Sequence, residues 1–226
     1  MAITRAQVSN VEALASWMQE NAVPNIFKSV TYADSVLTAT DADDNTVLSI
    51  QAANTGTGSG HFRAYRASAN YIGYNLQLIP NPGSPTIEII GCDNGFMFSC
   101  GVVASNGYGR YISALFTKTN NDKVAVIFSA ENKATATAAL TEGLIHVAFG
   151  DSATMSTTTT FTPEAAQQTC MTPFITNADV GNVSYTPNAR YLTAHSSYAS
   201  GIGKLLLGTD TWITNGYWCI KDGGAA

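Results

Sequence analysis

The clearest indication of how this chain folds is the stretch Thr86-Ile-Glu-Ile-Ile-Gly-Cys-Asp-Asn-Gly-Phe-Met-Phe-Ser-Cys100. Two apolar runs, residues 86–90 and 96–100, flank the turn sequence Cys-Asp-Asn-Gly, and this arrangement is typical of an antiparallel hairpin. Residues 111–117 and 123–129 flank Thr119-Asn-Asn-Asp122 in the same way. The middle of the chain is therefore predicted to consist of antiparallel hairpins.

Strand signals continue on both sides of this stretch. Towards the N-terminus, residues 36–40 and 46–51 predict a hairpin around Asp41-Ala-Asp-Asp-Asn45. A further strand is expected at residues 71–79, and towards the C-terminus we expect strands at residues 144–149, 204–207, 211–214 and 217–220. Asn215-Gly216 lies between the last two, and Asn-Gly between apolar residues is a strong hairpin signal. The pattern predicts a mainly β fold, an antiparallel β-sandwich or jelly-roll-like domain.

One helix is expected before the strands, from about Asn10 to Asn21. Ser9 and Glu12 have the spacing of a capping box, and Pro24 forbids continuation of the helix. An alternative start near Thr4 would lengthen it. Apolar residues recur at i, i+3, i+4 and i+7, which predicts one buried stripe formed by Val11, Leu14, Ala15 and Met18, with Trp17 beside it. This helix packs either on its own domain or on a neighbouring subunit.

These signals divide the chain into three segments. Residues 1–28 are expected to form an N-terminal helical arm, and residues 29–150 an antiparallel β domain. Residues 151–226 are expected to combine an irregular segment with C-terminal hairpins packed on the same domain. The irregular segment, residues 151–198, lacks periodicity, so it is either a functional loop or a region that a neighbouring molecule orders.

Charged residues make up 12% of the 226-residue chain, against about a quarter in an ordinary soluble domain. Threonine, serine and asparagine occupy the polar strand positions instead, and uncharged faces lose their water cheaply against another protein. The net charge of −5 and the scattered basic residues oppose binding to nucleic acid. No apolar run has the length of a membrane span, and the chain opens without a signal peptide, so we expect synthesis in a cytoplasm.

The cysteines and histidines do not form a recognisable catalytic or metal-binding pattern. Cys92, Cys100, Cys170 and Cys219 lack the tight pairs of a zinc site, and we expect them to be free thiols rather than disulfide-bonded. His146 lies within an apolar strand, and His195 lies next to hydroxyl residues without the surroundings of a serine nucleophile. We therefore expect no catalytic residue, no cofactor and no metal, and an enzyme is the least favoured function.

The acidic turn at residues 41–45 has two interpretations. Its sequence, Asp-Ala-Asp-Asp-Asn, could be a calcium loop, but it lacks the glycine and the distal glutamate of an EF-hand. A solvated turn is the favoured interpretation.

Aromatic residues near the C-terminus are candidates for contacts with a partner or with a glycan. Tyrosine and tryptophan are enriched in protein interfaces and in cores, so both interpretations remain open. The candidate interface or glycan-contact residues are Tyr185, Tyr191, Tyr198, Trp212, Tyr217 and Trp218.

Two C-terminal segments carry a resemblance to known proteins. They are residues 172–191, Thr-Pro-Phe-Ile-Thr-Asn-Ala-Asp-Val-Gly-Asn-Val-Ser-Tyr-Thr-Pro-Asn-Ala-Arg-Tyr, and residues 203–222, Gly-Lys-Leu-Leu-Leu-Gly-Thr-Asp-Thr-Trp-Ile-Thr-Asn-Gly-Tyr-Trp-Cys-Ile-Lys-Asp. Together these segments resemble uncharacterised virion structural proteins of tailed bacteriophages. The resemblance brings no catalytic motif. It implies a non-enzymatic subunit that assembles with copies of itself and with other virion proteins, in the head surface, neck, tail or baseplate. The alternative is a glycan-binding or host-attachment module on a phage particle.

Overall fold

The chain is built mainly of antiparallel β-sheet, as the sequence predicts. The computed structural model describes residues 4–51, 61–66, 70–74, 87–103, 109–119, 124–133, 143–149, 159–161, 170–171, 174–177, 182–185, 187–192, 203–207, 209–214 and 218–223. All strand pairs within these residues are antiparallel. The sheets pack face to face, which confirms the expected β-sandwich.

Seven of the described strands form sheet A, in the order β1-β7-β8-β9-β10-β11-β12. Apart from β1, which joins at one edge, each strand pairs with the next strand along the chain, so the sheet is built from successive antiparallel pairs. The strands are β1 (Thr4–Val8), β7 (Ile87–Cys92), β8 (Gly95–Val103), β9 (Gly109–Lys118), β10 (Val124–Lys133), β11 (Gly143–Phe149) and β12 (Thr159–Phe161).

Sheet B is a five-stranded meander of the described residues, in the order β2-β3-β4-β5-β6. Its strands are β2 (Ser29–Ala33), β3 (Val36–Thr40), β4 (Thr46–Gln51), β5 (His61–Arg66) and β6 (Asn70–Tyr74). The β3–β4 pair confirms the predicted hairpin at residues 36–51. The register shifts between Ala39 and Thr40, so that Val47 becomes an extra residue on β4. Val47 and Leu48 are consequently both part of the apolar core.

The C-terminal strands form sheet C, in the order β13-β16-β19-β18-β17, and beside it lies the two-stranded ribbon β14-β15. The strands of sheet C are β13 (Cys170–Met171), β16 (Ala189–Leu192), β17 (Gly203–Leu207), β18 (Asp210–Thr214) and β19 (Trp218–Lys221). The ribbon consists of β14 (Phe174–Asn177) and β15 (Asn182–Tyr185).

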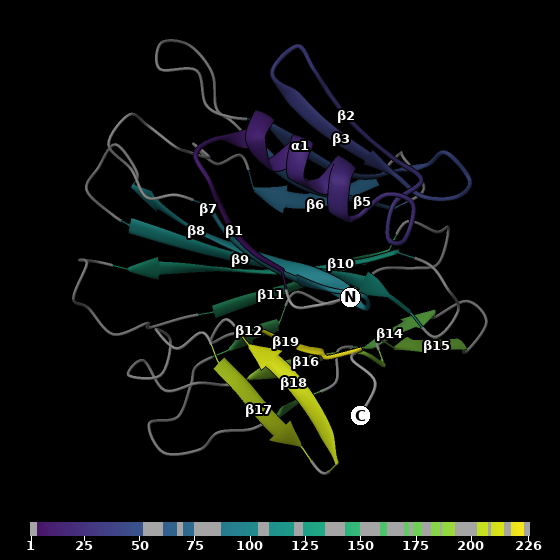
Figure 1. Ribbon diagram of the computed structural model, residues 1–226, viewed down its shortest axis with the longest axis vertical. Helices are drawn as coiled ribbons and strands as arrows, with labels where there is room; N and C mark the ends of the chain where they lie inside the picture. Colours follow the sequence, from purple (N-terminus) through teal and green to yellow (C-terminus); the bar gives the residue numbers. More distant parts are fainter. Residues whose placement is uncertain are drawn as a thin grey trace.

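The sheets are stacked in layers (Figure 1). Sheet B and the helix α1 (Val11–Asn21) lie above sheet A, and sheet C lies below it. Strand β19 of sheet C contacts β8 and β9 of sheet A, while β10 and β11 of sheet A contact strands of sheet B. The central strands of sheet A therefore have protein on both of their faces.

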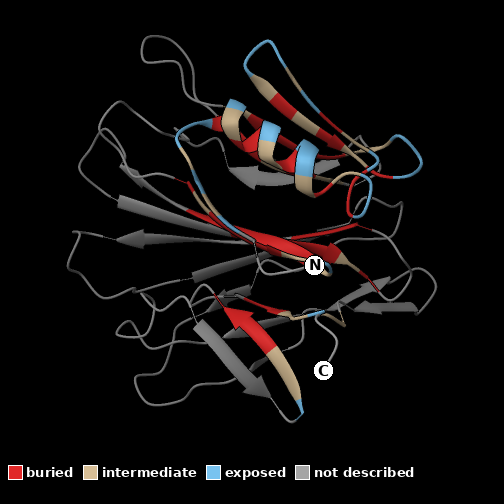
Figure 2. Cartoon of the chain, viewed as in Figure 1, coloured by how far each residue is buried: buried red, intermediate tan, exposed pale blue. Residues whose placement is uncertain are grey.

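The main core lies between α1, sheet B and the upper face of sheet A. Figure 2 shows buried residues along the inner stripe of α1 and in the centre of sheet A. Four phenylalanines join the layers: Phe96 stacks on Phe116 with ring centroids 4.6 Å apart, Phe27 meets both rings edge to face, and Phe98 stacks on Phe116. Burial of such rings contributes about 2 to 3 kcal/mol each.

Helix α1 confirms the expected buried stripe and corrects its expected start. Val11, Leu14, Ala15 and Met18 are buried, as their spacing predicts. The cap, however, is Asn10 and not Ser9, because Asn10 has extended backbone and its Oδ1 accepts a hydrogen bond of 2.8 Å from the Ala13 amide. The alternative start near Thr4 is also wrong, since residues 4–8 form strand β1, paired with β7.

The β7–β8 turn depends on a glycine that the strand pattern alone does not explain. Cys92 pairs with Gly95, so Asp93 and Asn94 form the predicted turn. Gly95 has a φ of +145°, and a Cβ at this position would lie 2.1 Å from the carbonyl oxygen of Phe116. No side chain fits there, and β8 can approach β9 closely at this point only because residue 95 is glycine.

The C-terminal part of the chain differs from the sequence prediction in two ways. Residues 151–198 do not lack regular structure, because β12 to β16 all lie within this segment. These strands have two to four residues each, too few to give a periodic signal. The predicted β18–β19 hairpin is present, but Thr214 pairs with Cys219, so its loop is longer than a two-residue Asn-Gly turn.

Candidate functional site

Four of the six aromatic candidates lie on strands of sheet C or of the β14–β15 ribbon. Tyr185 lies on β15, and Tyr191 on β16 is the register partner of Trp218 on β19. Trp212 on β18 is 3% exposed, so within this chain it is a core residue and is not available as a surface platform. Tyr198 and Tyr217 lie outside the described residues, as do the side-chain surroundings of Tyr185, Tyr191 and Trp218.

A shallow hollow lies where the end of α1 meets the β7–β8 turn. It measures about 300 Å³ together with its open mouth, and its residues come from α1, the segment after the helix and the turn: Trp17, Asn21, Asn25, Ile26, Gly91, Cys92, Asp93, Gly95 and Phe96. Its enclosed part has room for about one water molecule. We refer to it below as the Trp17 hollow.

The aromatic wall of the Trp17 hollow is held by two contacts. The rings of Trp17 and Phe96 meet edge to face, with centroids 5.2 Å apart. On the other strand, a Cβ at Gly91 would lie 3.0 Å from Cη2 of Trp17, so the indole lies directly against the backbone of β7. Trp17 remains partly exposed in this position. Sequence reasoning missed it, because it was treated only as a neighbour of the helix stripe.

Amide, carboxylate and thiol groups complete the hollow. The Nδ2 of Asn21 donates to the Trp17 carbonyl oxygen at 2.8 Å, which orients the amide. Asn25 and Asp93 are exposed, whereas Cys92 is half-buried. The Sγ of Cys92 donates to the carbonyl oxygen of Lys221 at 3.5 Å, beside a 2.9 Å bond from Asn94 Nδ2 to the same oxygen. The turn is therefore tied to the end of β19.

The thiol of Cys92 is not suited to act as a nucleophile. Burial raises its pKa, and the nearby carboxylates of Asp222 and Asp93 raise it further, against the opposing effect of backbone hydrogen bonds from Asn94 and Gly223. A raised pKa keeps the thiol protonated, and the thiolate is the reactive form. Cys92 and Cys219 are free thiols, in agreement with the sequence prediction for these two; the side chains of Cys100 and Cys170 lie outside the described part.

A second polar group that sequence reasoning missed lies on sheet B. Ser49 Oγ and His61 Nε2 are hydrogen-bonded at 2.8 Å, and the two residues are 6% and 8% exposed. Burial lowers the pKa of His61, and the positive charge of Arg63 lowers it further, so the imidazole is neutral at neutral pH. Two other histidines are weighed from the sequence for a catalytic role. His146 lies on β11, and His195 lies outside the described residues.

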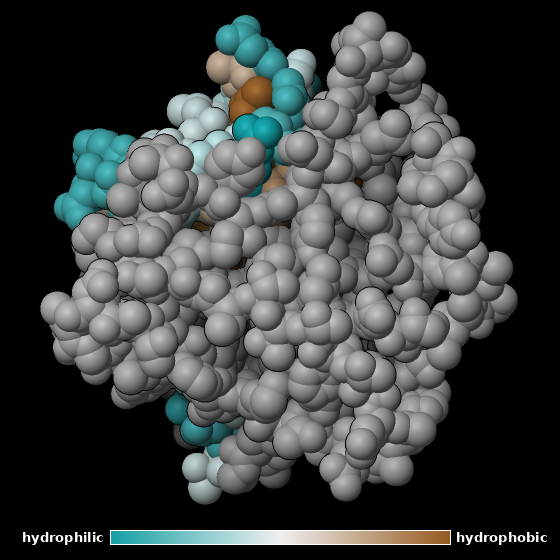
Figure 3. Space-filling model, turned by 180° about the vertical axis from the view of Figure 1, so that it is seen from behind, coloured by the Kyte–Doolittle hydropathy of each residue, from teal (hydrophilic) through white to brown (hydrophobic). Residues whose placement is uncertain are grey.

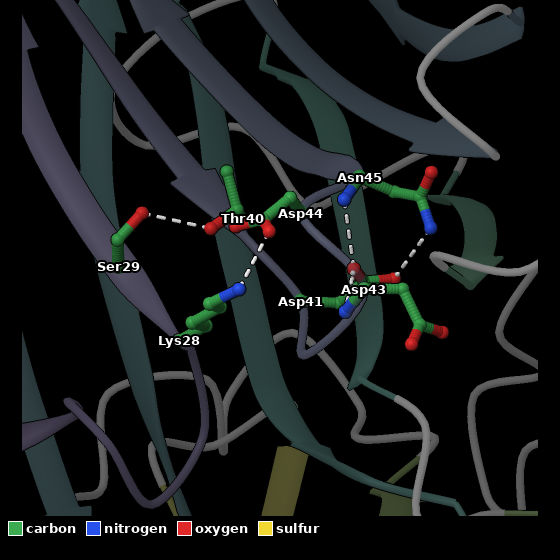
Figure 4. Close-up of polar contacts among 7 residues, drawn as sticks. All are labelled: Lys28, Ser29, Thr40, Asp41, Asp43, Asp44 and Asn45. Atoms are coloured by element: carbon green, nitrogen blue, oxygen red, sulfur yellow. Dashed lines mark hydrogen bonds and ion pairs between the residues drawn. The ribbon is translucent and has the colours of Figure 1, made fainter.

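The acidic turn at residues 41–45 is held together by its own hydrogen bonds (Figure 4). Asp41 Oδ1 accepts from the backbone amides of Asp43 and Asn45, at 3.0 and 2.9 Å, and its Oδ2 accepts from the Asn45 side chain at 3.3 Å. Asp44 forms an ion pair of 2.6 Å with Lys28. These contacts satisfy the Asp41 carboxylate as a turn cap, and they favour the interpretation of residues 41–45 as a structural turn.

The described residues form neither a metal-binding cluster nor a membrane-spanning helix. Among the residues that the structure describes, no three His, Cys, Asp or Glu side chains are grouped so that they could hold a metal ion. Within the same described ranges, no helix combines the length and apolar character needed to cross a lipid bilayer. No family model, no curated protein and no solved structure matches this chain.

Proposed function

We propose that this protein is a non-enzymatic structural subunit of a bacteriophage particle that acts by assembling with copies of itself. The observation that supports assembly is the outer face of sheet B. Along β2, β3 and β4, the side chains that point away from the core are hydroxyl, amide or small apolar groups, and none of these positions carries a charge. They are Ser29, Thr31, Ala33, Val36, Thr38, Thr40, Thr46, Ser49 and Gln51.

The strand register defines this face. Inward-pointing Leu37 pairs with Ile50, and the outward-pointing Thr38 between Leu37 and Ala39 pairs with Ser49. Ser29 and Thr40, also register partners, are joined through their hydroxyl groups at 2.7 Å. Most of these residues are partly or fully exposed. Figure 3 gives the view from behind. The described surface at the upper end, where sheet B lies, is mostly pale or hydrophilic, with a small hydrophobic area.

The physical link to assembly is the cost of removing water. A hydroxyl or amide group that is buried against a second subunit can exchange its water for a hydrogen bond. An ion that is buried in the same way loses several kcal/mol of hydration unless a partner charge compensates it. The uncharged part of the face, along β2, β3 and β4, is therefore suited to burial between subunits, and Arg63 on β5, the register partner of Ser49, places a charge at its border. The charged fraction of 12% for the whole chain is in accord with this. The assignment to a phage virion rests on the resemblance of residues 172–191 and 203–222.

Light scattering coupled to size-exclusion chromatography tests the proposal. The wild-type protein is expected to form a defined homo-oligomer at micromolar concentration. Thr31→Lys and Thr38→Lys place charges on the outer face of sheet B and should shift the protein towards monomer. Ser16→Lys is the matched control, because Ser16 is exposed on α1, away from this face. A wild-type protein that stays monomeric at all concentrations would contradict the proposal.

A further inference from the structure

We propose that the Trp17 hollow binds one sugar ring of a glycan. Nothing in the sequence points to this position, since the glycan candidates of the sequence lie near the C-terminus. The inference does not depend on assembly: a single subunit contains the whole hollow.

The shape of the hollow fits a ligand that lies across the surface. With enclosed room for about one water molecule and about 300 Å³ including the mouth, the hollow cannot enclose a nucleotide or a similar cofactor. A sugar ring in a glycan needs less enclosure, because it presents one face to the protein and the rest of the chain leaves through solvent. The open mouth provides this exit.

Trp17 supplies an aromatic surface whose position is fixed in advance. The edge-to-face contact with Phe96 and the close approach to Gly91 hold the indole in one place while part of it stays exposed. The face of an aromatic ring carries partial negative charge and attracts the weakly positive C–H groups on the apolar face of a sugar. A ring that is already fixed loses little entropy when the ligand binds.

The polar groups match sugar hydroxyls, each of which both donates and accepts hydrogen bonds. Asn21 commits its Nδ2 to the Trp17 carbonyl oxygen, so its Oδ1 is directed by that bond and can accept from a ligand. Asn25 is exposed and offers both a donor and an acceptor. Asp93 is exposed, and a carboxylate has about four acceptor positions, so it can accept from a hydroxyl in addition to its contacts within the chain.

Other ligand classes fit less well. The carboxylate of Asp93 disfavours an anion such as phosphate. Among the lining residues that the structure describes, only Asp93 and Cys92 are of a metal-binding type, and a protonated thiol is a poor metal ligand. An amine could contact Trp17 and Asp93 together, but it would leave the amides of Asn21 and Asn25 without a role. Sugar hydroxyls use the aromatic, amide and carboxylate groups at once.

The first experiment identifies a ligand and measures its affinity. The purified protein is screened on an array of bacterial surface glycans and titrated by calorimetry with the methyl glycosides of glucose, galactose, mannose and N-acetylglucosamine. We expect binding of at least one saccharide. Asn25→Ala and Asp93→Asn, both at exposed positions, should each weaken it at least about tenfold, the effect of losing a hydrogen bond that involves an ionised or well-oriented group. Asp34→Asn, an exposed acid in the β2–β3 turn, is the matched control and should bind like the wild type.

The second experiment locates the site. The chain contains three tryptophans, so fluorotryptophan labelling gives three ¹⁹F resonances, and Trp17→Phe identifies that of Trp17. The saccharide should shift this resonance and leave the other two unchanged. Three results would each overturn the proposal. The protein binds no saccharide, Asn25→Ala and Asp93→Asn leave the affinity unchanged, or the protein binds lysine methyl ester in place of sugars. None of these results depends on the oligomeric state, so failure here is distinguishable from failure of the assembly proposal.

Discussion

The centre of sheet A and strand β3 of sheet B differ in the pattern of burial along the strand, and their sequences differ accordingly. In the centre of sheet A, adjacent residues are buried alike: Met97 and Phe98 on β8, and Leu115 and Phe116 on β9, are all at most 2% exposed. In β3 of sheet B, burial alternates, with Leu37 and Ala39 buried and Thr38 partly exposed. Adjacent strand residues point to opposite faces, so a continuous apolar run marks a strand that is covered twice.

The structure identifies the two covers of sheet A. Phe98 and Phe116 belong to the core beneath α1 and sheet B. Met97 and Leu115 are register partners on the other face, where β19 contacts β8 and β9. The lesson is that the number of covered faces can be inferred from a strand sequence, while the identity of the cover cannot.

The largest effect is expected at the β7–β8 turn of sheet A. Gly95→Ala should lower the free energy of unfolding by at least about 3 kcal/mol, since it combines a disfavoured φ with a backbone clash at Phe116. Urea denaturation measures the change. Gly91→Ala is the matched control: its Cβ would lie 3.0 Å from Cη2 of Trp17, a contact that a displacement of a few tenths of an ångström relieves, so the loss should be about 1 kcal/mol. Equal losses in the two variants would show that the positive φ and the close backbone contact at Gly95 do not set the loss of stability.

The second test compares the lower face of sheet A with the outer face of sheet B. Leu115→Ala removes a fully buried side chain and should cost about 2 to 5 kcal/mol in chemical denaturation. Thr38→Ala, at a partly exposed position of β3, should cost less than about 1 kcal/mol. If Leu115→Ala proved as mild as Thr38→Ala, sheet C would not cover sheet A in solution.

A smaller effect of opposite sign is expected at the β2–β3 turn of sheet B. Asp34 and Ser35 have positive φ values of 51° and 63°, a conformation that favours glycine. Ser35→Gly should raise the free energy of unfolding by about 0.5 kcal/mol, because the relief of strain exceeds the extra entropy of the unfolded chain. Thermal denaturation measures it. Ser35→Ala keeps the strain and should give no gain; a gain of the same size would refute this explanation.

The smallest effect concerns His61, which affects stability only in acid. The folded pKa of His61 lies below its ordinary value of 6.5, so below that pH the unfolded chain binds a proton that the folded chain does not. His61 should therefore leave stability unchanged above about pH 6.5 and lower it progressively as the pH falls towards the folded pKa. Melting temperatures of the wild type and His61→Gln across this range give the comparison. The variant should lose less stability on acidification. If the melting temperatures of the two proteins fell in parallel, His61 would not be the cause of the loss.

The candidate sites show where sequence reasoning stops. His61 and Ser49 are 12 residues apart, and neither has a motif around it. Trp17 was visible only as an apolar residue near a helix stripe, and its partners Gly91 and Phe96 are distant in sequence. The C-terminal aromatic residues were singled out for their residue type, yet Trp212 is buried. Residue type identifies candidates for surface contacts, but exposure depends on which layers cover each strand.

The local elements of this protein can be derived from its sequence. The hairpins at residues 36–51 and 87–103 and the stripe of α1 follow from periodicity and turn residues, because strand and helix geometry set which neighbouring side chains share a face. Only the tertiary structure decided that sheet A lies between two covers, that Trp17 lies against Gly91 and that Ser49 meets His61. Each of these is a contact between elements, and such contacts depend on the packing of whole layers, which no local pattern encodes.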